Sequence, residues 1–312
     1  MNKGKIVVFG SFVVDLTSRA VHLPAPGETV IGKTFKLGPG GKGSNQGVAA
    51  HRAGADVTMI TKVGNDVFGK IATDLYLAEG MDTRYVFTDD SVETGTALIM
   101  VDDNSGQNQI LVVSGACGHI NDADINKALP VILDANILLM QLEINLDAIQ
   151  KILNIAHNNN IRVVLNTAPA QKLPQSVLGK ADIITPNEIE AGTLTGIEIK
   201  KPEQAQKAGE AFMKMGVKNV VITLGRQGVM VMTESFCELI PSLKVDTIDT
   251  TGAGDAFNGA FVTALAEGMD IFKAAQFGNI AGALAVTRLG TAPAMPFRNE
   301  IDNFFKTRRN IK

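Results

Sequence analysis

The sequence lacks the residues that mark several classes of protein. Its 312 residues include no tryptophan and only two cysteines, and its formal net charge is −3. Cys117 and Cys237 are widely separated, which argues against a disulfide framework and against a zinc site. Because there is no excess of basic residues, neither a nucleic acid nor a membrane is an expected partner. We expect a small-molecule partner and a reducing, cytoplasmic location.

Histidine clusters and long apolar runs are also missing. The four histidines are scattered, so a histidine-based triad or metal centre has no support. The first apolar run, residues 6–9, is too short for a signal peptide, and no later run reaches the length of about 18 residues that spans a membrane. Hydrophobic residues still make up 45% of the chain, which is enough for one large core. We expect residues 1–312 to form a single domain.

The apolar pattern alternates between strand and helix spacing in the second half of the chain. Strand-like runs occur at residues 137–142, 162–165, 183–185 and 220–224, and helix-like runs at residues 146–158, 187–194, 202–215, 256–266 and 271–286. Such alternation predicts an α/β fold, a mostly parallel sheet covered by helices on both faces. Residues 6–9 are apolar on both faces and are expected to be a buried strand of this sheet. Residues 228–233 and 238–241 are expected to add a short antiparallel pair.

Two β-rich segments interrupt this pattern early in the chain, at residues 11–41 and 93–116. The second is typical of a hairpin with a polar tip at residues 102–106. Our hypothesis is that the two segments pair into a small sheet that covers a site as a lid. The alternative is a pair of unrelated surface hairpins.

The stretch from Asp249 to Asp255 has the residue types of a phosphate-transfer site. Gly252 and Gly254 allow close backbone approach, and the helix-like pattern that follows puts their N–H groups at a helix start, which attracts anions. Asp255 adds a carboxylate beside that anion, where a proton acceptor is useful. The alternative is a tight turn followed by an ordinary first-turn carboxylate.

A glycine-rich run, residues 38–46, opens an earlier helix. It contains the G-x-G-x-x-G pattern of a dinucleotide fold, but it lies nearly thirty residues beyond the first strand instead of directly after it. It is not a Walker A loop, because Lys42 is followed by Gly43. What remains is a flexible loop with the ammonium of Lys42 and the carboxamide of Asn45, which suits a polyhydroxylated ligand.

Three further features lie where a parallel sheet binds its ligands. Asn187 and Glu190 share a helix face, where the carboxylate suits a hydrated Mg²⁺; the alternative is a helix cap with a solvated acid. Residues 223–228 are expected to form a strand end and a turn. Asp15 and Glu143 each follow an apolar strand, and the alternative for both is a satisfied acid at the sheet edge.

Four motifs give the chain a resemblance to the ribokinase family of ATP-dependent sugar kinases over essentially its whole length. In order, they are Gly40-Gly41-Lys42-Gly43-x-Asn45-Gln46, Asn187-x-x-Glu190, Thr223-Leu224-Gly225 and Asp249-Thr250-Thr251-Gly252-Ala253-Gly254-Asp255. The resemblance implies a ribokinase-like α/β fold in which the two β-rich segments are the lid. In this family the lid often doubles as a dimer interface, so a homodimer through the lid is expected.

The resemblance also implies a role for each matching residue. Asp255 is the base on the sugar hydroxyl, and the backbone amides of Gly252, Ala253 and Gly254 hold the charge that develops on the γ-phosphate. The sugar site comprises Val13, Asp15, Gly41, Lys42, Asn45 and Glu143, together with Asp255. The ATP pocket is lined by Asn187, Thr223, Gly225, Gly228, Gly254 and Asn279. Glu190 orders Mg²⁺ through water, and K⁺ is held by Asp249 and the carbonyls of Thr251, Ala285, Arg288 and Gly290.

Phosphoryl transfer makes modest demands on the base. The transition state is loose, so little proton removal is needed before the P–O bond breaks. A carboxylate at a helix N-terminus is favoured in its charged form. Asp255 is therefore expected to be acidic and still to serve as the base.

Two positions depart from the ribokinase pattern. The ribose-specific pattern at the exit of the first strand is Asn-x-Asp, whereas this chain has Val13-Val14-Asp15. Val13 makes no side-chain hydrogen bond, so the site is expected to tolerate or favour a sugar that lacks one hydroxyl. The resemblance points to 2-deoxyribose, because deoxyribokinase-like members carry an apolar residue at the matching position. Ala294 stands where many ribokinases have a hydroxyl residue near the cation, which puts the strength of cation binding in question.

The sequence thus predicts a carbohydrate kinase that uses ATP to phosphorylate the primary 5-hydroxyl of ribose or 2-deoxyribose. A kinase for another sugar or a nucleoside is the alternative within the family. Two alternatives come from other classes. An NAD-dependent dehydrogenase accounts for residues 38–43 but leaves residues 252–255 without a function. A non-catalytic sugar-binding regulator does not require Asp255 or Glu190, and this chain has both.

Overall fold

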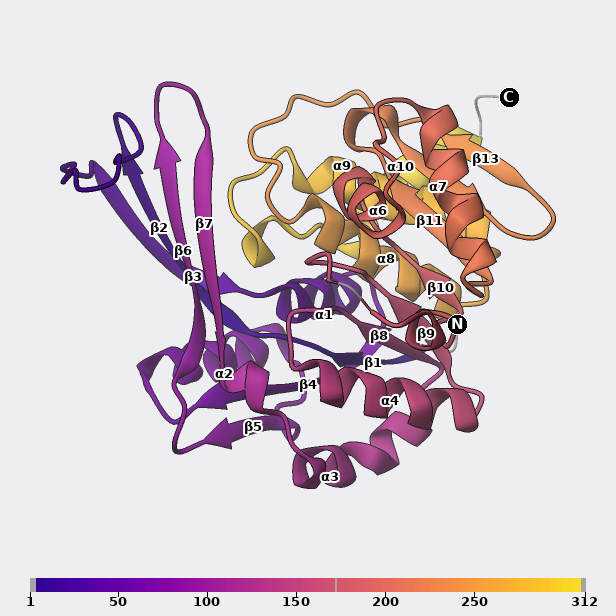
Figure 1. Ribbon diagram of the computed structural model, residues 1–312, viewed down its shortest axis with the longest axis horizontal. Helices are drawn as coiled ribbons and strands as arrows, with labels where there is room; N and C mark the ends of the chain where they lie inside the picture. The colour runs from indigo at the N-terminus through magenta and orange to yellow at the C-terminus, as the bar shows by residue number, and fades with distance from the viewer. Residues whose placement is uncertain (1–3, 172, 310–312) are drawn as a thin grey trace.

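The main sheet draws strands from most of the chain. A computed structural model describes residues 4–171 and 173–309. In that part of the chain, the large sheet has the strand order β13-β12-β11-β10-β9-β8-β1-β4-β5 (Figure 1). The strands are β1 (Lys5–Phe9), β4 (Asp56–Gly64), β5 (Val86–Asp89), β8 (Ile137–Met140), β9 (Arg162–Leu165), β10 (Ile183–Ile184), β11 (Asn219–Thr223), β12 (Val229–Met232) and β13 (Cys237–Ile240). β12 is antiparallel to both of its neighbours, and the other neighbouring strands are parallel.

Side chains of the central strands alternate between two cores, one on each face of the sheet. In β1, Ile6 and Val8 pack into the first core, and Val7 and Phe9 into the second. The first core is closed by α1 (Lys42–Arg52), α2 (Val67–Glu79), α8 (Ala253–Ala266), α9 (Ile271–Ala285) and α10 (Arg298–Arg309). The second is closed by α3 (Asp122–Leu133), α4 (Leu146–Asn158), α5 (Gln175–Leu178), α6 (Glu188–Thr195) and α7 (Pro202–Lys214). Burial on both faces explains the unbroken apolar runs of these strands.

The predicted fold class is confirmed, and the assigned elements end within about three residues of their predicted bounds. The sequence analysis missed α2, α3, α5, β5 and α10. Helix α3 contains Pro130, which interrupts a helical pattern. Helix α2 exposes Val67 and Leu77, so its apolar residues do not form one stripe. No helix of the described residues is long and apolar enough to span a bilayer.

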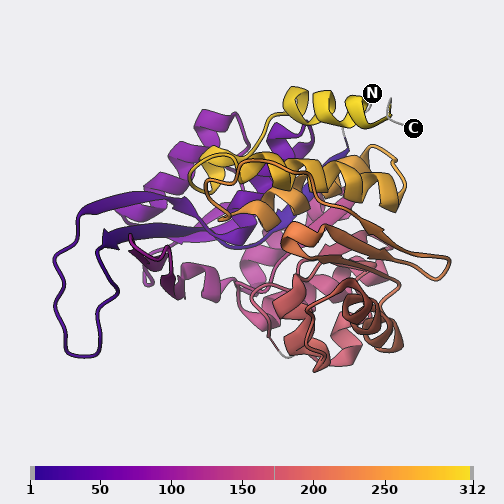
Figure 2. The ribbon, with the colours of Figure 1, turned by 90° about the horizontal axis from the view of Figure 1, so that it is seen from above.

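The two β-rich segments form a second sheet that projects from the body (Figures 1 and 2). Its order is β3-β2-β6-β7, with β2 (Val13–Ala20), β3 (Thr34–Gly40), β6 (Thr94–Asp102) and β7 (Asn108–Gly115). β2 and β6 run parallel and join the two segments, whereas the two outer pairs are antiparallel. The hypothesis that the segments pair is confirmed, and the alternative of unrelated hairpins is wrong.

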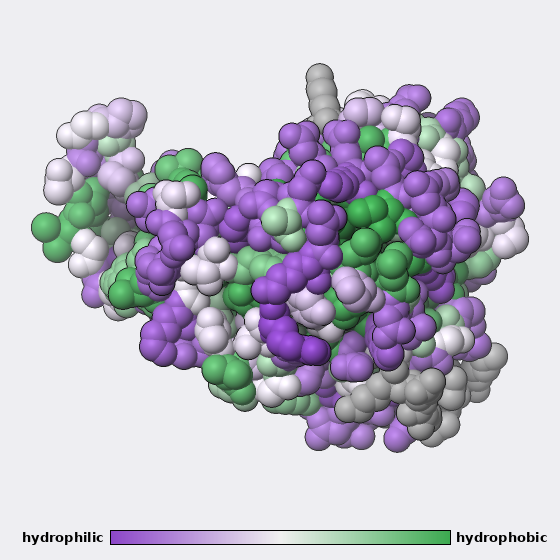
Figure 3. Space-filling model, turned by 90° about the horizontal axis from the view of Figure 1, so that it is seen from below, coloured by the Kyte–Doolittle hydropathy of each residue, from purple (hydrophilic) through white to green (hydrophobic). Residues whose placement is uncertain are grey.

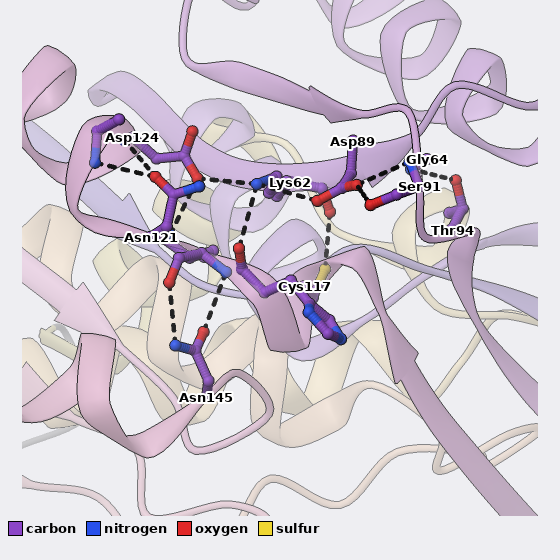
Figure 4. Close-up of polar contacts among 12 residues, drawn as sticks. Lys62, Gly64, Asp89, Ser91, Thr94, Cys117, Asn121, Asp124 and Asn145 are labelled. Carbon is purple, nitrogen blue, oxygen red and sulfur yellow. Dashed lines mark hydrogen bonds and ion pairs between the residues drawn. The ribbon is translucent and has the colours of Figure 1, made fainter.

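A buried polar junction ties this small sheet to the body (Figure 4). The short 3-10 helix η1 (Ala116–His119) follows β7, and its Cys117 Sγ lies 3.2 Å from the amide nitrogen of Phe12, just before β2. The same sulfur lies 3.1 Å from the carbonyl oxygen of Lys62 on β4. The 3-10 helix η1 therefore contacts both the residue that precedes β2 and the main-sheet strand β4.

Lys62 supplies the charge at this junction. Its ammonium lies 3.1 Å from a carboxylate oxygen of Asp89 and 3.1 Å from one of Asp124, and its side chain is 5% exposed (Figure 4). Burial opposes the charge of the ammonium, but hydrogen bonds from it to the two carboxylates raise the pKa of Lys62 above its usual value. Because a buried ammonium needs such partners, the junction holds one arrangement of β4, β5 and α3.

Candidate active site

The predicted sugar residues gather where the sheet order reverses. β1 and β8 are neighbours, and the chain continues from them toward opposite edges of the sheet, which is where open α/β sheets bind ligands. Ser11 follows β1 and Glu143 follows β8. The Ser11 hydroxyl donates a hydrogen bond of 2.5 Å to Glu143, and the backbone N–H of Lys42 donates one of 2.9 Å to the same oxygen. Glu143 thus links both loops to the start of α1.

The glycine-rich run begins within a strand of the small sheet, β3, and does not follow a strand of the main sheet. This position excludes the Rossmann fingerprint, which directly follows the first strand of the main sheet. Gly41 has a φ of 89°, and a Cβ atom there would lie 2.8 Å from the backbone nitrogen of Val13. Only glycine fits this position, because the chain must turn from β3 into α1 against β2.

Asp255 lies in the first turn of α8, with 8% of its surface exposed. The Asn45 carboxamide donates to one of its oxygens at 3.1 Å, and the Gln46 carboxamide donates to the other at 2.9 Å. The buried Oδ1 of Asn45 has no hydrogen-bond partner in the described part of the chain. A buried acceptor beside a carboxylate is the arrangement that a ligand hydroxyl satisfies.

The expectation that Asp255 is acidic is wrong. Burial raises the pKa of Asp255 above its usual value, and the nearby charge of Glu143 acts in the same direction. Lys42 and the donors from Gln46 and Asn45 oppose that rise. The sequence shows the helix start but not the burial, which comes from the packing of α1 on α8.

Helix α8 begins with free backbone donors. Gly252 is its N-cap residue, with a φ of 76°. In the described chain the N–H groups of Gly252 and Gly254 have no acceptor, whereas that of Ala253 donates a long bond of 3.3 Å to the Thr250 carbonyl. Such donors at a helix start attract an anion. Two of the three amides predicted to hold the phosphate are therefore free.

Lys42 connects the two predicted halves of the site. Burial opposes its charge, but Asp255, Glu143 and Glu190 together raise the pKa of its ammonium. Glu143 belongs to the predicted sugar side and Glu190 to the predicted nucleotide side. One buried ammonium therefore interacts electrostatically with carboxylates of both predicted sides.

Asn187 and Glu190 cap helix α6. The Asn187 side chain accepts hydrogen bonds from the amides of Ile189 and Glu190, and Glu190 accepts from both the backbone and the side chain of Asn187 at 2.9 Å. The helix-cap interpretation is confirmed, but the expectation that the acid is solvated is wrong. Glu190 is only 9% exposed, and burial raises its pKa. Contacts of either residue with a nucleotide or Mg²⁺ stay a prediction.

The other predicted ATP residues come from the same edge of the sheet. Thr223 pairs with Asn187 in an isolated bridge. Gly228, with a φ of 106°, lies so close to β13 that a Cβ atom would be 1.9 Å from the carbonyl oxygen of Ile240. Asn279 on α9 donates a hydrogen bond of 2.9 Å to the carbonyl of Pro241, the next residue. Gly225 begins the short 3-10 helix η2 (Gly225–Gln227), between Thr223 and Gly228.

The predicted cation residues lie in the loop before α8, at the end of α9 and in the loop that follows α9. Asp249 accepts hydrogen bonds from the backbone of Thr251 at 2.9 Å and of Gly290 at 3.0 Å. Burial opposes its charge, but these N–H donors hold the pKa of Asp249 below its usual range. The backbone of Arg288 donates to the Ala285 carbonyl at 3.1 Å. A carboxylate and backbone carbonyl oxygens are hard oxygen ligands of the kind a K⁺ ion would need, and K⁺ binding here stays a prediction. Ala294 is buried in the neighbouring 3-10 helix η3 (Ala292–Ala294).

The sequence analysis missed several polar residues of the site. Ser11 holds Glu143, and Gln46 holds Asp255. Gln141 and Asn166 contact Gln46 in turn. Two features of the sequence could have identified them. Gln141 is a polar residue directly after an apolar strand, and Gln46 is a second carboxamide next to Asn45.

A buried carboxylate beside free helix-start amides is the arrangement expected of an enzyme that transfers an anionic group to a hydroxylated small molecule. Comparison with known proteins narrows this class. The chain matches the pfkB family of carbohydrate kinases over residues 3–298. It is 40% identical to the ribokinase of Haemophilus influenzae over 96% of this chain and 98% of that protein.

Two further relatives bear on the substrate. The chain is 33% identical to the deoxyribokinase of Salmonella typhi over 96% of this chain and 98% of that protein. Its fold matches the structure of Arabidopsis thaliana ribokinase complexed with ribose and ATP, with a TM-score of 0.88 and 30% identity over 98% and 99% of the two chains. The protein belongs to the pfkB family of carbohydrate kinases.

We expect Asp15→Asn to stabilise the protein increasingly as the pH rises. Burial, with the charges of Glu143 and Asp255, raises the pKa of Asp15 to about 7. Between about pH 4 and pH 7 the folded protein therefore holds a proton that the unfolded chain has lost, so stability falls as the pH rises. The asparagine variant does not lose stability in this way. Its free energy of unfolding should therefore exceed that of the parent protein by about a few kcal/mol above pH 7.

Thermal unfolding from pH 4 to pH 8 measures this effect. The control is Asp74→Asn, an exposed acid on α2, which should gain no pH-dependent advantage. A constant difference in Tm between Asp15→Asn and the parent protein across this range would contradict the prediction.

Proposed function

We propose that the protein is an ATP-dependent pentose kinase that transfers the γ-phosphate to the primary 5-hydroxyl of ribose or 2-deoxyribose. The observation that carries the proposal is the buried Asp255, which lies between the donors of Asn45 and Gln46 at a helix start with free amides. Membership of a carbohydrate kinase family supports it. So do the relatives named ribokinase and deoxyribokinase and the structure described with ribose and ATP.

The proposed reaction forms a bond between the sugar oxygen and the γ-phosphorus, and it breaks the bond between that phosphorus and the oxygen that bridges it to the β-phosphate. The proton of the sugar hydroxyl passes to Asp255. The amides of Gly252, Ala253 and Gly254 stabilise the negative charge on the equatorial oxygens, which is the main electrostatic demand of a loose transition state. The raised pKa of Asp255 makes it a better acceptor than an exposed aspartate.

The proposed sugar site lies under one face of the small sheet. Val13 and Asp15 alternate with Val14 along β2, so their side chains share a face. Val14 belongs to the first core, whereas Val13 is 2% exposed and belongs to neither core. Asp15 interacts electrostatically with Glu143 and Asp255, which supports this face as the one that covers the sugar. We propose that closure of the sheet, residues 11–41 and 93–116, excludes water, which would otherwise compete for the phosphate.

The nucleotide is proposed to bind along the edge formed by Asn187, Thr223, Gly225, Gly228 and Asn279, with its phosphates toward Gly254. Glu190 is proposed to hold Mg²⁺ through water, since its oxygens already accept from Asn187. Bound Mg²⁺ neutralises charge on the phosphates. K⁺ is proposed to bind at Asp249, Thr251, Ala285, Arg288 and Gly290, where it adds positive charge beside the helix start. Rates in K⁺ against Na⁺ test this site.

We also propose that the second face of the small sheet forms a homodimer. Strand register aligns Leu37, Leu16, Leu98 and Leu111 across all four strands, on the face opposite Asp15. Three of them, Leu37, Leu98 and Leu111, are 42%, 44% and 61% exposed. Figure 3 shows hydrophobic residues, in green, on the part that projects from the body at the left. A row of exposed leucines on one face is typical of a protein interface.

The alternatives from other classes lose support. The dinucleotide interpretation needs the glycine-rich run directly after the first strand of the main sheet, whereas the run begins within β3 of the small sheet. A non-catalytic regulator has no need of a buried Asp255. The two cysteines are free, which supports the proposal of a reducing, cytoplasmic compartment.

Replacement of Asp255 by asparagine tests the proposed function. We expect kcat for pentose phosphorylation to fall by about 10²–10⁴-fold, because the proton acceptor is lost. ATP binding, measured by calorimetry, should stay within a few-fold of the parent protein. Retained turnover in the variant would remove Asp255 from the mechanism.

Replacement of Val13 by asparagine tests the choice of sugar. The added carboxamide offers a hydrogen bond to the 2-hydroxyl, so the ratio of kcat/KM for ribose to that for 2-deoxyribose should rise by about tenfold. Val13→Leu, which adds no polar group, is the control. An unchanged ratio in Val13→Asn would contradict the assignment.

Charged substitutions test the dimer. Leu98→Glu and Leu111→Glu place carboxylates on the outer face, and each should shift sedimentation from a dimer to a monomer. Val67→Glu on α2 changes an apolar residue that is 77% exposed elsewhere and should leave the dimer intact. A parent protein that sediments as a monomer at micromolar concentration would exclude this interface.

A further inference from the structure

A chain of buried neutral side chains lies behind Asp255, and none of its members is predicted to touch a substrate. They come from α1, from α8 and from the ends of three neighbouring strands. They are Gln46 on α1, Gln141 after β8, Asn166 after β9, Thr185 after β10 and Asn258 on α8. Each is at most 6% exposed. Each makes at least one hydrogen bond within the chain, while Oε1 of Gln141 has no hydrogen-bond partner among the described residues.

Gln46 is the branch point of the chain. Its amide nitrogen donates to Asp255 Oδ1 at 2.9 Å and to Asn166 Oδ1 at 3.0 Å, which uses both of its hydrogens. Its own carbonyl oxygen accepts from Gln141 at 2.7 Å. Both hydrogens and the oxygen of the Gln46 carboxamide are thus hydrogen-bonded, with its nitrogen toward the carboxylate.

A second arm returns to the helix that carries Asp255. Asn166 donates to the carbonyl of Thr185 at 2.6 Å, and the Thr185 hydroxyl donates to Asn258 at 2.6 Å. Asn258 donates in turn to the carbonyl of Gly254 at 2.9 Å, beside Asp255. The hydrogen-bonded path therefore runs from the Asp255 carboxylate past the ends of β9 and β10. It returns to Gly254, the residue before Asp255.

The direction of these bonds fixes each amide. A flipped Gln46 would direct its carbonyl oxygen at Asp255 and at the carbonyl oxygen of Asn166, which is repulsive in both contacts. The network consequently presents only a donor to Asp255. A donor stabilises the charged carboxylate over the protonated acid and also holds its plane in one orientation.

We propose that Gln46, held by Gln141 and Asn166, is a positioning residue that orients the Asp255 carboxylate and keeps it a proton acceptor. This inference rests on the proposed kinase function, in which Asp255 receives the proton of the sugar hydroxyl. Gln46 contacts neither the sugar nor ATP in this scheme. It acts through Asp255 alone.

The test is the pH dependence of kcat in two variants of Gln46. Gln46→Met keeps the length of the side chain and removes the donor. We expect kcat at pH 7 to fall about 10-fold to 100-fold, with KM for sugar and ATP within threefold of the parent values. The midpoint of the rise of kcat with pH should move up by about one pH unit. Gln46→Glu adds a second carboxyl beside Asp255 and should move the midpoint further.

Two controls separate positioning from a general effect on folding. Gln206→Met on α7, where Gln206 is exposed, should keep the parent kcat and pH profile. Thr185→Val breaks the second arm and Thr185→Ser keeps its hydroxyl. Thr185→Val should move the midpoint in the same direction as Gln46→Met, and Thr185→Ser should restore it. These variants keep the inference testable if Gln46→Met does not fold.

The outcomes distinguish this inference from the proposed function. A parent midpoint and parent kcat in both Gln46→Met and Thr185→Val would overturn the positioning role. A fall of kcat with an unmoved midpoint would also overturn it, because that result indicates only structural damage. If the parent protein phosphorylates no pentose, the proposed function fails. Infrared titration of the Asp255 carboxyl in the parent and in Gln46→Met then tests the network by itself, and equal titration midpoints would overturn it.

Discussion

The structure depends on the burial of one carboxylate at a helix start. Asp255 is 8% exposed, and removing its charge from water is costly unless hydrogen bonds and a cation compensate. The compensation comes from Asn45 and Gln46 on α1 and from the ammonium of Lys42. Helix α1 must therefore pack against the start of α8. This contact brings the glycine-rich run and the late glycine motif into one site although they lie about 200 residues apart.

The same requirement extends outward to the rest of the site. Lys42 interacts with Glu143 as well as with Glu190, so one cation serves carboxylates of both predicted ligand sides. Glu143 is held by Ser11, and Ser11 leads into β2 of the small sheet. The first strand of the small sheet is thus joined to the charged centre, while the Cys117 and Lys62 junction fixes its base (Figure 4). A movement of the sheet is consequently coupled to the position of Asp15.

Much of the fold was predictable from local sequence pattern. Periodicity predicted most strands and helices, because burial on one or both faces imposes a spacing on apolar residues. Gly252 was predictable as a special position and has a positive φ, whereas Gly254, predicted with it, does not. The polar network was not predictable in the same way. Gln141 and Asn166 are 95 and 120 residues from Gln46, and no local rule relates a carboxamide at the end of one strand to another on a distant helix.

By itself the sequence determined the fold class, the family and the residue types of the site, because these follow from periodicity and from short motifs. Tertiary structure decided the protonation behaviour of Asp255 and Glu190. The sequence places both in the first turn of a helix, where the backbone favours the charged form. Packing buries both side chains, and the loss of hydration outweighs the effect of the helix and raises their pKa values. Desolvation depends on every neighbouring element, so it exists only once the chain has folded.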